Sequence, residues 1–187
     1  MTFRMLAAPA AFSLLLLSGC SATPPSPQVN ALHQEVSQLN QQMRTLTHQA
    51  TALEIQGQLN GQLNQGAWLL PQANTPVELE TQLGKLRLSL THVRGEPGGS
   101  RAVLTLVAPQ NQPLPALRAQ VVWGELDPAS GKPLEAESVS QPLSVAAGLT
   151  PRSSVTVSLR LNGFTPQQLG YVRIHQVEPL SAASPQR

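Results

Sequence analysis

The chain has 187 residues, with 12 Lys+Arg against 10 Asp+Glu, so its formal net charge is +2. This balance excludes a strongly basic nucleic-acid-binding protein, and the single cysteine excludes a disulfide scaffold. Because 41% of the residues are hydrophobic, there is enough apolar material for a core, which argues against disorder throughout the chain.

Residues 1–19 have the layout of a secretory signal peptide. Arg4 precedes an apolar run, Met5–Leu17, and small residues follow it. The run has 13 residues. A helix needs about 20 residues to cross a bilayer, so we expect no permanent transmembrane span here.

The leader ends in four residues typical of the lipobox of bacterial lipoproteins: Leu17, Ser18, Gly19 and Cys20. The thiol of Cys20 can be alkylated by a diacylglyceryl donor, and the small residues before it give a peptidase access to the bond. The alternative is a structural cysteine behind an ordinary signal peptide, but a lone thiol cannot form an intramolecular disulfide.

The resemblance to bacterial lipoproteins implies cleavage between Gly19 and Cys20, followed by S-diacylglyceryl and N-acyl modification of Cys20. Two or more acyl chains give stable membrane anchoring, whereas one does not. The next residue is Ser21 instead of Asp. In a Gram-negative source, this pattern implies sorting to the outer membrane, most simply on its periplasmic face.

Residues 20–28 are expected to form a proline-rich tether, and residues 29–64 a heptad helix. From Val29, apolar residues recur at alternating intervals of three and four over four heptads, which predicts a coiled-coil-like helix. The apolar positions are Val29, Leu32, Val36, Leu39, Met43, Leu46, Ala50 and Leu53.

A stripe of two apolar residues in seven matches a helix–helix seam, so we expect self-association through these eight positions. The flanking positions, such as Asn40 and Gln42, are nearly uncharged, so charge specifies the partner only weakly. Val–Leu heptads favour parallel dimers, although Met43 and Ala50 weaken that preference. The alternatives are a single helix folded back on the rest of the chain, or a marginal helix without a partner.

From Trp68 onward the hydrophobic period changes to two, which predicts short strands within residues 66–180. Because no helix of crossover length separates the strands, we expect an antiparallel β-sandwich or small barrel of six or seven strands. Residues 181–187 are expected to be a disordered tail. The clearest strands are at 86–90, 102–108, 117–123, 155–161 and 171–177, with a less regular one at 134–145 and one helical turn at 165–169.

The strand-rich body of the chain, residues 66–180, contains no motif that indicates catalysis or metal binding. Asp127 precedes Pro128 and is expected to form a turn. His92 and His175 lack a third metal ligand at a suitable spacing. The carboxylate pairs Glu78/Glu80 and Glu135/Glu137 are expected to be solvated on strand faces. We therefore expect no enzyme, no cofactor beyond the covalent lipid on Cys20, and no nucleic-acid partner.

Three blocks of the body, at residues 68–90, 113–117 and 169–179, together with the lipobox and heptads, resemble the YajI-like family of bacterial lipoproteins. The members of that family share a domain of unknown function. The resemblance implies an immunoglobulin-like β-sandwich behind an N-terminal helix, on a lipid anchor. It carries over no catalytic or ligand-binding residues.

The resulting expectation is a non-enzymatic, lipid-anchored envelope lipoprotein. A helical spacer would present its β-sandwich as a binding or structural module to an envelope-protein or cell-wall partner. The alternative is a periplasm-facing carrier that holds a small apolar ligand between its sheets.

Overall fold

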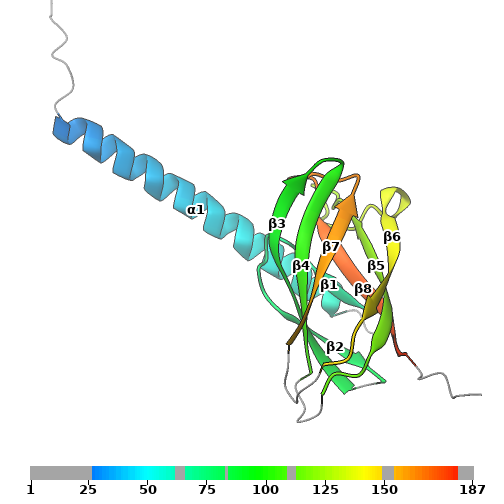
Figure 1. The fold of residues 1–187 in the computed structure, drawn as a ribbon. Coiled ribbons are helices and arrows are strands. Elements are labelled where there is room, and N and C mark those ends of the chain that lie inside the picture. The colour runs from blue at the N-terminus through cyan, green and yellow to red at the C-terminus, as the bar shows by residue number, and fades with distance from the viewer. Residues whose placement is uncertain (1–26, 62–65, 83, 109–112, 149–153, 181–187) are drawn as a thin grey trace, which may run out of the picture. The chain divides into compact units, whose positions relative to one another are not determined.

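A computed structural model describes residues 27–61, 66–82, 84–108, 113–148 and 154–180 of the chain (Figure 1). The chain divides into two compact units, with the boundary between Asn40 and Gln41. The expected leader 1–19, most of the expected tether 20–28 and the expected tail 181–187 lie outside the described residues.

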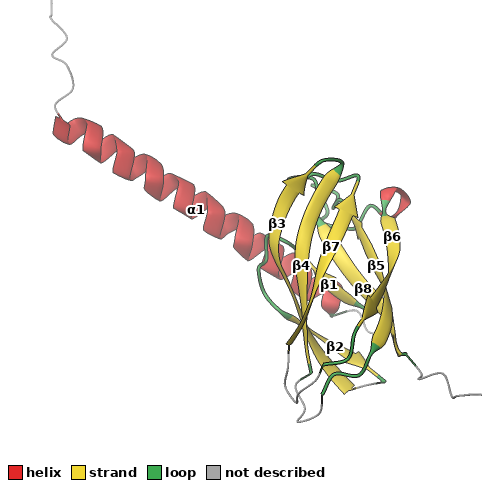
Figure 2. Cartoon of the chain, viewed as in Figure 1, coloured by secondary structure: helices red, strands yellow, loops and turns green. Residues whose placement is uncertain are grey.

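The second unit contains two four-stranded sheets in which every pairing is antiparallel (Figure 2). Sheet A has the spatial order β1 (Ala67–Leu69), β8 (Tyr171–Pro179), β5 (Leu117–Gly124) and β6 (Val139–Val145). Sheet B has the order β2 (Val77–Thr81), β3 (Gly84–Glu96), β4 (Gly99–Val107) and β7 (Ser154–Asn162).

The core contains the inward-facing side chains of both sheets, and it is mainly aliphatic. Leu88 and Leu104 of sheet B and Val121 and Ile174 of sheet A have no exposed surface. Period-two alternation in each strand supplies one apolar face to this core and one polar face to solvent. The expected antiparallel β-sandwich behind an N-terminal helix is confirmed, although the described residues form eight strands and the sequence predicted six or seven.

The tight β3–β4 hairpin depends on glycine. Glu96 pairs with Gly99, so Pro97 and Gly98 alone make the turn, and Gly98 has a φ of 86°. This left-handed conformation favours glycine. A Cβ atom at Gly99 would collide with the carbonyl oxygen of Leu161 on β7. Both glycines are therefore required for β4 to lie between β3 and β7.

Helix α1 extends from Pro27 to Asn60, whereas the sequence predicted a helix over residues 29–64. Proline suits the first turn of a helix, because its missing N–H would have no helical acceptor there, so Pro27 belongs to α1 and not to the tether. At the other end, the Gly61 N–H donates to the Gly57 carbonyl at 2.9 Å. No helix of the described part is long and apolar enough to span a membrane.

The expected strand at 134–145 is wrong in its first third. Glu135–Glu137 form a 3₁₀ turn, and β6 begins only at Val139. The Glu137 and Ser138 N–H groups donate to the carbonyls of Leu134 and Glu135, closing two i→i+3 hydrogen bonds. Consequently Glu135 and Glu137 do not share a strand face.

Candidate functional site

The predicted lipidation and cleavage residues, Leu17, Ser18, Gly19 and Cys20, lie outside the described residues. The predicted helix seam is described. All eight of its positions are exposed, from Val29 at 41% to Leu46 at 64% for the large side chains. These apolar side chains therefore do not contribute to the core of the chain that carries them.

A different face of α1 packs against sheet A within the second unit. Ala52 and Gln56 are buried, while Ile55 and Leu59 are half-buried. Their spacing of three and four residues places them on one side of the helix. None of them occupies a predicted seam position. The seam and the packed face are thus two separate surfaces of one helix.

Two side-chain amides attach this face to the backbone of β1 and of the segment that follows it. Asn60 Nδ2 donates to the Trp68 carbonyl at 2.8 Å, and the Trp68 N–H donates to Asn60 Oδ1 at 2.9 Å. Gln56 Oε1 accepts from the Leu70 N–H at 2.8 Å, and Gln56 Nε2 donates to the Thr75 carbonyl at 3.2 Å. The amides satisfy main-chain groups that another strand would otherwise pair.

An apolar cluster around Trp68 and Tyr171 lies beside these amides. The two rings are 5.0 Å apart between centroids, and the Arg173 guanidinium lies 4.8 Å from the centroid of Trp68. Ala52 of α1 completes the cluster. Burial raises the pKa of the Tyr171 hydroxyl, and a hydrogen bond with Ser138 opposes that shift. The cluster fixes the end of α1 by packing and provides no reactive group.

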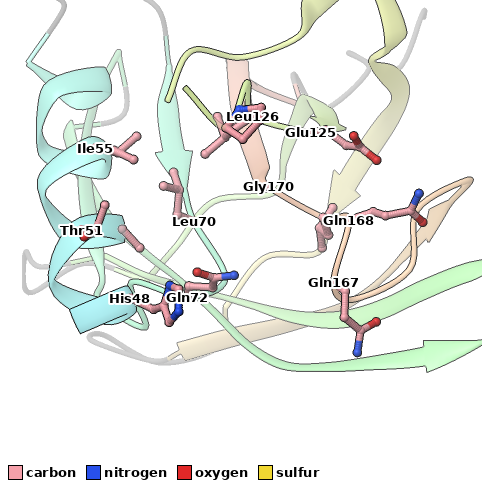
Figure 3. Close-up of a pocket in the computed structure, with 13 residues that line it drawn as sticks. His48, Thr51, Ile55, Leu70, Gln72, Glu125, Leu126, Gln167, Gln168 and Gly170 are labelled. Atoms are coloured by element: carbon pink, nitrogen blue, oxygen red, sulfur yellow. The ribbon is translucent and has the colours of Figure 1, made fainter. Parts of the chain in front are cut away.

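A hollow of about 390 Å³ opens beside the helix end (Figure 3). His48, Thr51 and Ile55 contribute from α1, and the turn that contains Gln167 and Gln168 contributes from the opposite side. Hydrogen bonds from Gln168 and Leu169 N–H to the Thr165 carbonyl form this turn, as the predicted helical turn requires. The lining is mainly apolar, and its polar side chains include His48, Glu125, Gln167 and Gln168.

A second hollow, of about 820 Å³, lies against β2 and β8. Glu78, Glu80, Arg173 and His175 line it. Partial burial lowers the pKa of His175, and the charge of Arg173 lowers it further. The surface therefore carries charges of both signs.

Asp127 and Glu80, two of the other polar residues considered in the sequence, form local hydrogen bonds or ion pairs. Asp127 Oδ1 accepts from the Ala129 N–H, the Ser130 N–H and the Ser130 hydroxyl, which confirms its predicted turn role. These Ser130 contacts lower the Asp127 pKa. Glu80 pairs with Lys85 at 3.3 Å. Within the described residues, His, Cys, Asp and Glu form no group of three that could hold a metal ion.

Sequence reasoning did not identify Gln56 and Asn60. Both are polar, and Asn60 stands at a heptad position where the seam expects an apolar residue, so the pattern seemed to end there. Their spacing of four residues was the available signal, because it places both amides on one helix face.

The chain is similar to proteins of one family. The family model described as "Protein of unknown function (DUF3251)" matches residues 24–184. The uncharacterized lipoprotein YajI of Escherichia coli (strain K12) is 33% identical over 172 residues, which are 90% of this chain and 96% of that protein.

Two solved structures are similar as well. The solution NMR structure of YajI from Escherichia coli has a TM-score of 0.66 at 32% identity, covering 72% of this chain and 80% of that one. The trimeric lipoprotein SadB of Salmonella enterica has a TM-score of 0.53 at 18% identity, covering 81% of this chain and 76% of that one. The likeness to SadB shows the fold.

Proposed function

The chain belongs to the YajI-like lipoprotein family, whose model is described as "Protein of unknown function (DUF3251)", and we propose that it is a non-enzymatic, lipid-anchored envelope protein that self-associates through α1. In this proposal the assembled helices present several β-sandwiches to a partner in the envelope.

One observation carries the proposal: α1 has two faces, and only one of them is used within the chain. Gln56 and Asn60 attach one face to β1, while Leu39, Met43 and Leu46 on the seam are exposed. Full burial of a large aliphatic side chain contributes about 1.5–3 kcal/mol. Repeated along the seam, this contribution favours association of helices.

A second copy of the chain is the partner that fits the seam. The strict heptad spacing allows side chains of one helix to enter the holes of an identical helix. The flanking positions Asn40, Gln42 and Thr47 are uncharged, so like-charge repulsion between copies does not arise there. SadB, which has a similar fold, is a trimeric lipoprotein, which supports assembly; the number of copies is a quantity to be measured.

The membrane anchor in the proposal is the lipid on Cys20. The lipobox residues Leu17–Cys20 and the lipoprotein relative support it, and Ser21 supports an outer-membrane destination on the periplasmic face. The other prediction, a carrier of a small apolar ligand, gains no support from the described residues. Leu88, Leu104 and Trp123 are buried between the sheets, where such a ligand would lie.

Sedimentation of residues 21–187 tests the self-association. The wild-type chain should form a defined oligomer at tens of micromolar, and Leu39→Glu/Leu46→Glu should be a monomer whose β-sandwich still unfolds cooperatively. Both leucines are exposed in the single chain, so charge there affects association and not the fold.

Gln34→Glu/Gln41→Glu is the matched control, because it adds the same charges at exposed positions with the same spacing but outside the seam. This control should remain oligomeric. A wild-type chain that sediments as a monomer would remove the self-association from the proposal.

A further inference from the structure

The two sheets have four edge strands, and three of them are protected against pairing with another strand. At β1, Asn60 occupies the main-chain groups of Trp68. The five-residue β2 carries Glu78 and Glu80. In β6, Pro142 stands at the centre of the strand and has no N–H to donate. These are common ways in which proteins prevent edge-to-edge association.

The fourth edge strand, β7, has neither a capping side chain nor a proline among the described residues, and its single charged residue is Arg160. It is nine residues long, contains no proline, and pairs with β4 without a register shift from Ser154 to Asn162. Figure 1 shows β7 beside β4, at the margin of its sheet. Alternate main-chain groups of β7 therefore face outward along a regular edge.

The charged residue of this edge and the residues directly across from it on the neighbouring strands are arginines. Arg94, Arg101 and Arg160 are neighbours across β3, β4 and β7 in the strand register. Arg101 donates through Nε and Nη2 to Glu96 Oε2, both at 2.8 Å. Arg94 and Arg160 form no ion pair with any carboxylate of the described residues. Like charges opposite each other on a sheet are unfavourable, so a carboxylate added beside Arg160 would be stabilising.

We propose that the β7 edge binds an extended segment of a partner protein that adds a strand to sheet B and places an acidic residue beside Arg160. Main-chain hydrogen bonds would give most of the affinity, and the acidic residue would set the register. The proposal deepens the proposed function by assigning a partner class to the presented sandwich. Its readout is binding at β7, which involves neither the lipid nor the seam, so the two proposals can fail separately.

A second copy of this chain fits the edge less well. Arg160 is the single charged residue of β7, so pairing of two β7 strands would bring no carboxylate to it. The β2 strand of another copy has glutamates, but it has five residues against the nine of β7, and its Glu80 is already paired with Lys85.

The experiment uses the acylated mature protein in detergent micelles and a labelled synthetic peptide of the length of β7. The peptide alternates valine with threonine and carries one aspartate positioned to face Arg160. A matched peptide has lysine in place of that aspartate. We expect saturable binding of the aspartate peptide, measured by fluorescence anisotropy, with slowed deuterium exchange in residues 154–162.

Charge exchange tests the register. Arg160→Glu should reverse the preference between the two peptides, weakening the aspartate peptide roughly threefold to tenfold, as expected for a cross-strand pair changed from attraction to repulsion. Arg87→Glu is the control, because Arg87 is exposed on the same sheet but on the interior strand β3. This variant should keep the wild-type preference.

Absence of binding, or protection of a strand other than β7, would overturn the proposal. So would protection, in the free protein, of the outward-facing amides of β7 that do not pair with β4. Protection that rises with concentration and disappears in Glu78→Lys/Glu80→Lys would assign the edge to a second copy. Protection lost on removal of residues 181–187 would assign it to the chain's own C-terminal segment.

Discussion

The side chains of Gln56 and Asn60 bond to the backbone of β1 and of the segment after it as a short strand would. The carboxamide of Asn60 both accepts from and donates to Trp68, and Gln56 does the same toward Leu70 and Thr75. Gln56 is 3% exposed, so water cannot replace it without rearrangement of the chain. A polar residue is required at this position, because the Leu70 N–H and the Thr75 carbonyl would otherwise lose their partner.

Replacement of Gln56 by alanine should lower the free energy of unfolding by about 1–3 kcal/mol, because it leaves the Leu70 N–H and the Thr75 carbonyl unsatisfied. Urea denaturation measures this loss when Gln56→Ala is introduced into the Leu39→Glu/Leu46→Glu chain, where association does not contribute to the free energy of unfolding. Gln42→Ala, at an exposed site on the same helix, is the control. Equal losses in both variants would contradict a tethering role for Gln56.

His175 should make the stability pH-dependent. Burial and Arg173 lower its folded pKa below the ordinary value of 6.5, so the unfolded chain binds the proton more readily. Stability from this group is complete above pH 6.5 and is lost as the pH falls from there through the folded pKa. His175→Gln should flatten the pH profile of urea denaturation in that window. An NMR titration midpoint for His175 at or above the ordinary value would refute the mechanism.

At the scale of elements, periodicity in the sequence predicted most of the fold. Leu86, Leu88 and Leu90 alternate with polar residues and are buried in β3, as the period of two requires. The spacing of leucines from Leu32 to Leu53 predicted α1 equally well. Long, regular patterns are reliable because every residue in them reports the same buried face.

Short elements and tertiary contacts were not predictable in this way. Strand β1 has three residues, which is too few for a period to be recognised. Glu135 and Glu137 follow the spacing of a strand, but local i→i+3 hydrogen bonds give a 3₁₀ turn. The attachment of α1 through Gln56 depends on β1, a partner distant from the helix pattern. The heptad spacing therefore predicted the exposed seam and not the face that packs.

At the scale of the whole molecule, the two faces of α1 have different roles in the proposed function. One face holds the helix end to its own sandwich, and the seam is available to other copies. The open β7 edge belongs to the sandwich itself. If three or more sandwiches are held together, a partner with several binding segments would bind them more tightly than a single segment binds one β7 edge. Binding of the first segment raises the effective concentration of the others at the remaining edges.

In the proposed function, the acyl groups on Cys20 anchor the protein to the membrane. Two or more acyl groups are enough to anchor even a single chain stably. Cys20→Ala should therefore give a precursor that retains its 19 leader residues and incorporates no labelled palmitate in cells. Gel mobility and autoradiography measure both properties. Ser21→Ala keeps the thiol and should be processed and labelled normally. Removal of the leader from Cys20→Ala at the usual position would show that this cysteine is not the acylation site, and the anchor would then have to lie elsewhere in the chain.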